Sequence, residues 1–379
     1  MKNPLCGLIF VVLPWFPTIA KGPDSELPKS KAIEDQVRML MAEEDVKGLA
    51  IAVIDDRTIH HLAAYGHRNV AKQLPLETDT IMYGASLTKT AFAYLVLQLV
   101  DEGRLDLDTT IDRVLPRPLP QYEFWRSLQG DEDWRQLTPR LILHHATGLA
   151  NLRYFEENRD LKFHFKPGER YGYSGEGIKI LQTVLEEGLG LDVKAEMQRR
   201  IFDRFAMPNT SMQWREDFTA NLADGYAMDG SFEPHDERSN VSAAGSMDTT
   251  IADQAQMWRG ILAGEGLSAE MRAELVKPGF PITSARQFPT LRTERDPRGA
   301  KINLAAGMGL ITFQGQNGLT WFKGGHNNWT GNMVVCEEER KRCVVLLANS
   351  VRAELIFPRI VRFILGETQA PWWWEYGFE

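Results

Sequence analysis

The stretch from Leu87 to Val100 constrains the fold most, because it is apolar almost all the way round a helix. A surface helix keeps one polar face, so a helix that lacks one must be covered by other elements on every side. Glu102-Gly103 predicts its C-terminal end, and Ser86 lies at its N-terminus. A chain of 379 residues is long enough to enclose such a helix, as one large domain or two closely packed ones.

Apolar periodicity along the rest of the chain predicts strands near both ends and helices between them. A helix is expected over 31–44, and two strands, 49–54 and 58–65, have the pattern of a hairpin. The middle, roughly 105–275, is predicted to be mostly helical, with helices over 138–145, 177–187, 193–205 and 251–262. The later part is predicted to contain strands over 309–313, 319–322, 333–336 and 343–347, and then a helix over 351–365. This order predicts an α+β fold, in which helices flank one antiparallel sheet built from both chain ends and a mostly helical domain is inserted.

The first 20 residues have the pattern of a cleaved export signal. Lys2 precedes an apolar stretch over 5–16, and small residues occupy the peptidase positions of Thr18-Ile19-Ala20. A retained anchor is the alternative, but the apolar stretch is short and contains Pro14. We therefore expect an exported protein, periplasmic or secreted, without a stable membrane span after cleavage.

Export makes a disulfide possible between Cys336 and Cys343, the two cysteines outside the predicted signal. They flank a charged turn between two predicted strands, so a hairpin would place them roughly opposite each other. The alternative is two buried thiols. Neither cysteine has the second Cys/His pair of a zinc site, so no metal is expected.

The net charge argues against a nucleic-acid partner. The formal charge is -8, and no dense Lys/Arg run with interleaved aromatic residues opposes that total. The sequence does not predict an oligomeric state.

Ser86 and Lys89 form the pattern that points most directly to chemistry. A serine hydroxyl needs a base within hydrogen-bond reach, and a lysine three residues later lies on the same face of the helix. Burial, the positive helix N-terminus and a second nearby cation would each lower the pKa of Lys89 and favour the neutral amine. No other serine has a lysine at this spacing. The alternative is a serine N-cap with an exposed lysine.

The stretch Tyr83-Gly84-Ala85-Ser86-Leu87-Thr88-Lys89-Thr90 resembles the first motif of the serine β-lactamase-like family. This family includes class C β-lactamases, D-alanyl-D-alanine carboxypeptidases and related family VIII-type esterases. Further stretches resemble its helix after the nucleophile, its His-x-Ser-Gly-Leu signature, its second catalytic motif and a later structural marker, in the family's order: 97–105, 144–149, 167–175 and 243–247.

The resemblance runs from about residue 30 to 366 and implies a domain organisation. A sheet subdomain is expected over about 30–85 and 300–366, and a helical subdomain over about 86–275. An aromatic tail, 367–379, would follow. Its Trp372-Trp373-Trp374 could mark a partner surface or a membrane interface, but such a tail more often packs onto its own domain.

The second catalytic motif of the family, Tyr-x-Asn, corresponds to Tyr173-Ser174-Gly175. The resemblance implies that Tyr173 passes a proton to the leaving group, with its pKa lowered by adjacent cations. Tyr171 is the alternative if the register differs. Gly175 replaces an asparagine that in β-lactamases helps to hold the lysine and the substrate, so a β-lactam substrate is less favoured.

The third motif, Lys-Thr-Gly, corresponds to Lys323-Gly324-Gly325 at the end of a predicted strand. Lys323 could bind a substrate carboxylate and adjust neighbouring pKa values, and the glycines would let an acyl chain lie along the strand. The backbone N–H of His326 is then the expected second oxyanion donor, beside that of Ser86. An exposed edge-strand lysine is the alternative.

The resemblance implies a serine hydrolase that cleaves an ester or amide, including β-lactam or D-Ala-D-Ala-type peptide substrates, through an acyl-enzyme on Ser86. No metal or organic cofactor is expected. His145 resembles a structural histidine of the family signature, and the chain lacks the Gly-x-Ser-x-Gly motif of other serine hydrolases. The alternative function is a penicillin-binding-like or ligand-binding protein that keeps the pocket without turnover.

Overall fold

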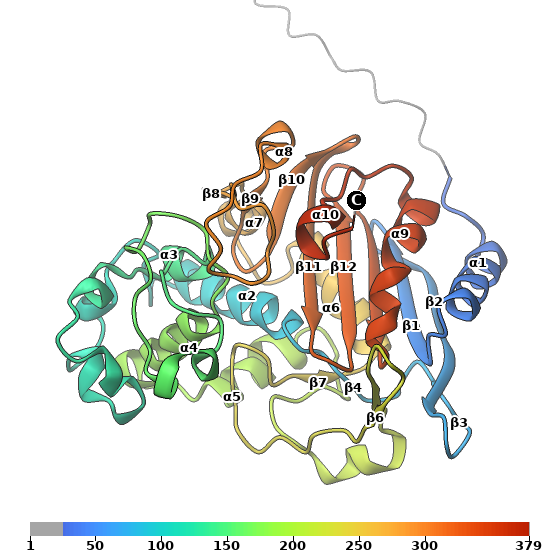
Figure 1. Ribbon diagram of the computed structural model, residues 1–379, viewed down its shortest axis with the longest axis horizontal. Helices are drawn as coiled ribbons and strands as arrows, with labels where there is room; N and C mark the ends of the chain where they lie inside the picture. Colours follow the sequence, from blue (N-terminus) through green and yellow to red (C-terminus); the bar gives the residue numbers. More distant parts are fainter. Residues whose placement is uncertain (1–25, 379) are drawn as a thin grey trace, which may run out of the picture.

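The computed structural model describes residues 26–378, and its centre is one antiparallel sheet (Figure 1). Within this range the sheet contains nine strands in the order β3-β2-β1-β13-β12-β11-β10-β9-β8. The strands, in chain order, are β1 (Gly48–Asp55), β2 (Thr58–Asn69), β3 (Leu74–Pro75), β8 (Phe280–Pro281), β9 (Ala305–Ala306), β10 (Ile311–Gly315), β11 (Gly318–His326), β12 (Gly331–Glu337) and β13 (Arg342–Ala348).

The two chain ends meet in the middle of this sheet. Strand β1 pairs with β13 from Leu49 opposite Ala348 to Asp55 opposite Arg342. The same strand pairs with β2 as the predicted hairpin. The predicted α+β fold, with an antiparallel sheet built from both ends, is therefore confirmed.

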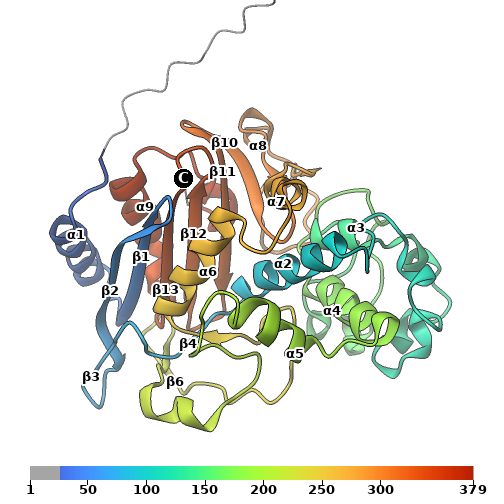
Figure 2. The ribbon, with the colours of Figure 1, turned by 180° about the vertical axis from the view of Figure 1, so that it is seen from behind.

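Helices cover both faces of the sheet. The odd-numbered residues Leu49, Ile51 and Val53 of β1 pack into one core, with α1 (Ser30–Glu43) and α9 (Phe357–Leu365). The even-numbered Ala50, Ala52 and Ile54 pack into a second core on the other face, with α2 (Leu87–Asp101) and α6 (Ile251–Ala263). Figure 1 shows the first layer in front, and Figure 2 shows the second. Alternate strand residues point to opposite faces, and because both faces are covered, β1 is apolar from Leu49 to Ile54.

Helix α2 lies between the sheet and the helical part, as its apolar surface predicts. Every residue from Leu87 to Leu99 is buried. The shorter helices are α3 (Pro139–Leu143), α4 (Gly175–Thr183), α5 (Val193–Met197), α7 (Ala269–Val276) and α8 (Arg298–Lys301). Of these, α5 and α7 contact α2, whereas α8 lies near β10 in Figure 2.

Several predicted helices were too long. The helices predicted over 177–187 and 193–205 are α-helical only to Thr183 and Met197. Each then continues as one π-helical turn, Val184–Gly188 and Gln198–Phe202. The helix predicted over 351–365 is a 3₁₀ turn followed by α9. Pro358 explains this break, because a proline has no backbone N–H to continue the hydrogen bonds of a preceding helix but is tolerated in a first turn.

Cys336 and Cys343 lie opposite each other on β12 and β13. The structure joins them by a disulfide, with their Cα atoms 4.1 Å apart. The predicted signal, 1–20, lies outside the described residues. Within residues 26–378, no helix is long and apolar enough to cross a membrane.

Candidate active site

Ser86 lies at the junction between a short strand and the buried helix. Strand β4 (Met82–Tyr83) leads into Ala85, whose φ of 45° turns the chain sharply before α2 begins. The Ser86 side chain makes no capping hydrogen bond to the helix, so its hydroxyl is not used as an N-cap. The structure therefore does not support the capping alternative.

Lys89 provides a buried amine beside this hydroxyl. Its Nζ lies 3.0 Å from Ser86 Oγ and donates a 2.5 Å hydrogen bond to the carbonyl oxygen of Ala244. Burial lowers the pKa of Lys89 well below its usual value, and the positive charges of Lys323 and Lys179 lower it further. The neutral amine is favoured, which is the form that can accept a proton.

Tyr173, not Tyr171, faces this pair. Its phenol is hydrogen-bonded to Ser86, and Lys323 Nζ donates to the same oxygen over 3.2 Å. The Tyr171 hydroxyl instead donates to Gln287 Oε1, 2.9 Å away. The expected lowering of the Tyr173 pKa is wrong: burial raises it, and the hydrogen bond with Ser86 only partly opposes that rise. Burial therefore favours the neutral, protonated phenol of Tyr173.

Lys323 is buried within the site, not exposed on an edge strand. Burial lowers its pKa to about 8, and the carboxylate of Glu375 acts in the opposite direction. Its Nζ also donates a 2.6 Å hydrogen bond to the carbonyl of Gly324. Its hydrogen bonds to the Tyr173 hydroxyl and the Gly324 carbonyl hold the Lys323 amine next to Tyr173.

Gly325 lets β11 approach the start of α2 closely. A Cβ on Gly325 would lie 2.9 Å from the backbone nitrogen of Ser86 and 3.1 Å from that of Leu87. His326 follows as the last residue of β11, and its Nδ1 lies 3.0 Å from Glu354 Oε1. Burial disfavours the charged imidazole, but the carboxylates of Glu354 and Glu375 together outweigh burial and raise the pKa of His326.

The glycine at position 175 has a steric explanation. It is the first residue of α4, and its backbone N–H donates 3.0 Å hydrogen bonds to both the carbonyl and the side-chain oxygen of Asn151. A Cβ at this position would lie 2.8 Å from that carbonyl oxygen. The loop around Asn151 therefore occupies the space that the family's asparagine would need.

His145 supports the tyrosine loop. Its Nδ1 accepts a 3.2 Å hydrogen bond from the backbone N–H of Ser174, and its ring packs 4.3 Å from that of Tyr173. Burial, with the charges of Lys89 and Lys323, lowers the pKa of His145 well below its usual value. This neutral, enclosed imidazole fits the predicted structural role.

The cavity at Ser86 is small, about 10 Å³, which is room for about one water molecule. Its lining contains most of the predicted site together with three residues that the sequence analysis missed. The lining residues are Ser86, Tyr173, Gln287, Phe288, Lys323, Gly324, Gly325, His326 and Glu375. Gln287 and Phe288 lie in a proline-rich loop that has no periodic signal. Glu375 could have been noticed in the sequence, because it is an acidic residue within a run of aromatic residues.

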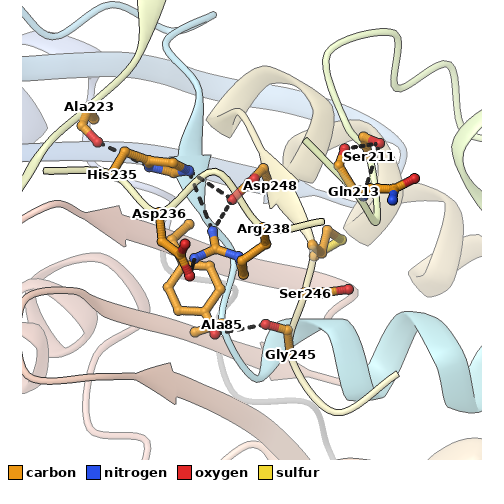
Figure 3. Close-up of polar contacts among 12 residues, drawn as sticks. Ala85, Ser211, Gln213, Ala223, His235, Asp236, Arg238, Gly245, Ser246 and Asp248 are labelled. Carbon is orange, nitrogen blue, oxygen red and sulfur yellow. Dashed lines mark hydrogen bonds and ion pairs between the residues drawn. The ribbon is translucent and has the colours of Figure 1, made fainter. Parts of the chain in front are cut away.

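A buried cluster of charges holds the chain just before Ser86 (Figure 3). Arg238 donates a hydrogen bond to Asp248 Oδ1, which also lies 3.1 Å from His235 Nε2. The Arg238 guanidinium lies over the Tyr83 ring, 3.9 Å from its centroid. Tyr83 is the residue of β4 that pairs with Asp248 of β7 (Asp248–Thr249). The cluster thus fixes the strand that presents Ser86.

A larger cavity of about 470 Å³ lies at this cluster, and its lining includes Tyr83, Arg238 and Trp329. None of Ser86, Lys89 and Tyr173 lines it. Ser86, Tyr173 and Lys323 instead line the smaller cavity, and Lys89 Nζ lies 3.0 Å from Ser86 Oγ.

The fold and the group formed by Ser86, Lys89, Tyr173 and Lys323 define the class of the protein. It is an α+β enzyme of the β-lactamase-like type, with a serine next to a lysine on a buried helix. The sequence matches the Beta-lactamase family over residues 33–362. The chain therefore belongs to that family, as its motifs predicted.

Comparisons with individual proteins agree with this assignment. The chain is 27% identical over 182 residues to penicillin-binding protein 4 of Amycolatopsis lactamdurans, which covers 45% of this chain and 45% of that protein. It is 24% identical over 341 residues to the lovastatin esterase of Penicillium rubens, covering 71% and 83%. The match thus spans less than half of the first relative's length.

Among solved structures, the octameric penicillin-binding protein homologue from Pyrococcus abyssi is similar in fold. It superimposes with a TM-score of 0.70 at 18% sequence identity, covering 90% of this chain and 78% of that one. At this identity the similarity concerns the fold alone.

Proposed function

We propose that this chain is a serine hydrolase that cleaves a carboxylic ester or amide through an acyl-enzyme on Ser86. The observation that supports this most is the distance of 3.0 Å between Lys89 Nζ and Ser86 Oγ, in a place where burial favours the neutral amine. A serine hydroxyl with such a base is the pairing that nucleophilic catalysis needs.

In the proposed reaction, Lys89 Nζ takes the proton of Ser86 as Oγ attacks the substrate carbonyl carbon. The backbone N–H groups of Ser86 and His326 stabilise the negative charge on the carbonyl oxygen. Tyr173 then protonates the leaving group as the tetrahedral intermediate breaks down. Lys323, which donates to the phenol oxygen, holds Tyr173 in place. Water then attacks the acyl carbon and gives a proton to the Tyr173 phenolate, and Lys89 returns its proton to Ser86 Oγ as the ester bond to the enzyme breaks and the acid leaves.

Among possible substrates, we propose an ester rather than a β-lactam. Gly175 removes the amide that in β-lactamases holds the acylamino side chain, and the adjacent Asn151 carbonyl leaves no space for it. One relative, which the chain matches over most of that relative's length, is named an esterase, and another is named a penicillin-binding protein. Because these names point to different activities, we base the choice between an ester and a β-lactam on the residues of the site.

Export is a separate proposal. It depends on the signal-like residues 1–20, for which cleavage after Ala20 would be expected. N-terminal sequencing of the protein recovered from a periplasmic extract would test it: a mature chain that begins at Lys21 supports export, and an uncleaved chain in the cytosol contradicts it.

The activity is tested by turnover of p-nitrophenyl acetate and of a chromogenic cephalosporin, with Ser86→Ala as the matched control. We expect ester cleavage that falls to background in the variant, and little cephalosporin turnover. Rapid cephalosporin turnover would contradict the substrate proposed here. No Ser86-dependent turnover of either, with biological activity unchanged in Ser86→Ala, would favour the alternative of a binding protein that keeps the pocket.

A further inference from the structure

The aromatic tail packs onto the sheet beside the active site. Its helix α10 (Trp372–Glu375) lies in front of β11 and β12 in Figure 1. The fully buried ring of Trp374 lies 6.3 Å from that of Phe322 on β11 and 5.8 Å from that of Tyr171. The tail thus packs onto its own domain, one of the alternatives that the sequence left open, and this packing fixes the position of Glu375.

The Glu375 side chain is held inside the site. It is 5% exposed, and its Oε2 accepts a 2.6 Å hydrogen bond from Gln287 Nε2. Gln287 is itself fixed, because its Oε1 accepts from Tyr171 and its backbone N–H donates to the Trp374 carbonyl over 2.9 Å. The carboxylate therefore has one defined position.

That position depends on an unusual glycine. Gly324 stands where the family motif Lys-Thr-Gly has threonine, and a Cβ on Gly324 would overlap Glu375 Oε1. A threonine at position 324 would therefore require the Glu375 carboxylate to move from this position.

Glu375 and Lys323 line the same cavity as Ser86. Burial raises the pKa of Glu375 to about 7 and lowers that of Lys323 to about 8, and the charge of each opposes the effect of burial on the other. Next to them, His326 Nδ1 lies 3.0 Å from Glu354 Oε1. Where Glu375 is ionised, above its pKa of about 7, it offsets the positive charge of Lys323, and a substrate carboxylate would enter beside a buried negative charge.

We infer that Glu375 is a specificity-determining residue: it occupies the carboxylate-binding side of the site, so the enzyme takes esters whose leaving group carries no carboxylate. This inference rests on the proposed function and defines its substrate class. It also replaces the expectation that Lys323 favours a substrate carboxylate, and it argues against D-Ala-D-Ala-type peptides, which end in one.

Two esters with one acyl group test this inference. Phenyl acetate and 3-acetoxybenzoate release phenol and 3-hydroxybenzoate, which differ by one carboxylate. We expect the wild-type kcat/KM to favour phenyl acetate, and Glu375→Gln to reduce that preference about tenfold or more, mainly through KM for the charged ester. The kcat for phenyl acetate is measured alongside, so that a general loss of activity is separated from a change in the ratio of the two esters.

Three controls separate specificity from loss of structure. Glu375→Asp keeps the charge and should keep most of the preference. Glu354→Gln removes a carboxylate that lies near the cavity but does not line it, and should leave the preference close to that of the wild type. Lys323→Met combined with Glu375→Gln should abolish the gain for the charged ester, since that gain depends on the freed amine.

The outcomes distinguish this inference from the proposed function. If both esters are cleaved in a Ser86-dependent way and Glu375→Gln leaves their ratio unchanged, the inference is wrong and the proposed function stands. If neither ester shows Ser86-dependent cleavage, the proposed function fails and the inference fails with it. A wild-type preference for 3-acetoxybenzoate would also overturn the inference.

Discussion

The Lys323 amine donates a 3.2 Å hydrogen bond to the hydroxyl of Tyr173, and this contact joins strand β11 to the loop that precedes α4. The two residues are 150 positions apart in the sequence. Because the same phenol is hydrogen-bonded to Ser86, the contact connects both amines of the site through one tyrosine and one serine. The charge of Lys323 should therefore affect the proton transfers of Lys89.

Replacing Lys323 by methionine is predicted to move the acid limb of the pH profile of kcat/KM to higher pH. The positive charge of Lys323 lowers the pKa of Lys89, so its removal raises that pKa, and the base then becomes neutral only at higher pH. Lys179→Met, which removes a more weakly acting charge, should produce a smaller shift in the same direction. Profiles of ester hydrolysis between pH 5 and about 10 would show both shifts. An unchanged acid limb in Lys323→Met would mean that Lys89 is not the titrating base.

Tyr173→Phe is predicted to lower kcat by about 10² to 10⁴, because it removes a group that gives a proton to the leaving group. Tyr171→Phe is the matched control: its hydroxyl bonds Gln287 rather than Ser86, so its kcat should change far less. Steady-state kinetics on an ester with a poor leaving group, such as a phenyl ester, would show the difference best. Equal losses in the two variants would contradict the role assigned to Tyr173.

Gly175→Asn, which restores the family residue, is predicted to destabilise the protein rather than create a β-lactamase. The added side chain would meet the Asn151 carbonyl, and overpacking of this kind costs about 1–3 kcal/mol. Gly190→Asn is the control, since a Cβ there meets nothing within 4 Å and the φ of 64° suits asparagine. Urea denaturation would measure stability, and a chromogenic cephalosporin would measure turnover. A stable Gly175→Asn variant with rapid cephalosporin turnover would refute this prediction.

Asp248→Ala is predicted to lower the free energy of unfolding by about 2–3 kcal/mol, somewhat less than for a fully buried pair, because Arg238 is partly exposed. Asp236→Ala removes the exposed partner of the same arginine and should cost less than about 1 kcal/mol. Both values are measurable by urea denaturation. Similar losses in the two variants would show that burial of Asp248 does not stabilise the strand before Ser86.

The parts of the fold that local pattern determines could be predicted. The apolar surface of Leu87 to Val100 gave the buried helix α2, and β-rich runs gave strands β11, β12 and β13 to within a few residues. Helix α7 was missed. Strands β8 and β9 were also missed, because a strand of two residues is too short to show an alternating apolar pattern.

The site was predictable where chemistry follows a fixed spacing, as in Ser86 and Lys89, or where a family motif places a residue, as in Tyr173 and Lys323. The contribution of the tail was not. Glu375 reaches Gln287 across 88 residues of sequence, and only the packing of Trp374 on β11 brings it there. The pKa of Tyr173 was predicted in the wrong direction, because the extent of its burial depends on tertiary contacts with His145 and Phe288.

The central claim, that Ser86 is the nucleophile and Lys89 its base, is tested most directly by covalent labelling with a fluorophosphonate. Mass spectrometry of the tryptic peptide spanning 73–89, or 73–104 in the Lys89→Met variant, would locate the label. We predict one label per chain, on Ser86, with parallel loss of ester hydrolysis, no labelling of Ser86→Ala, and labelling slowed about a hundredfold or more in Lys89→Met. A label on another residue, or equal labelling of Ser86→Ala, would contradict the account.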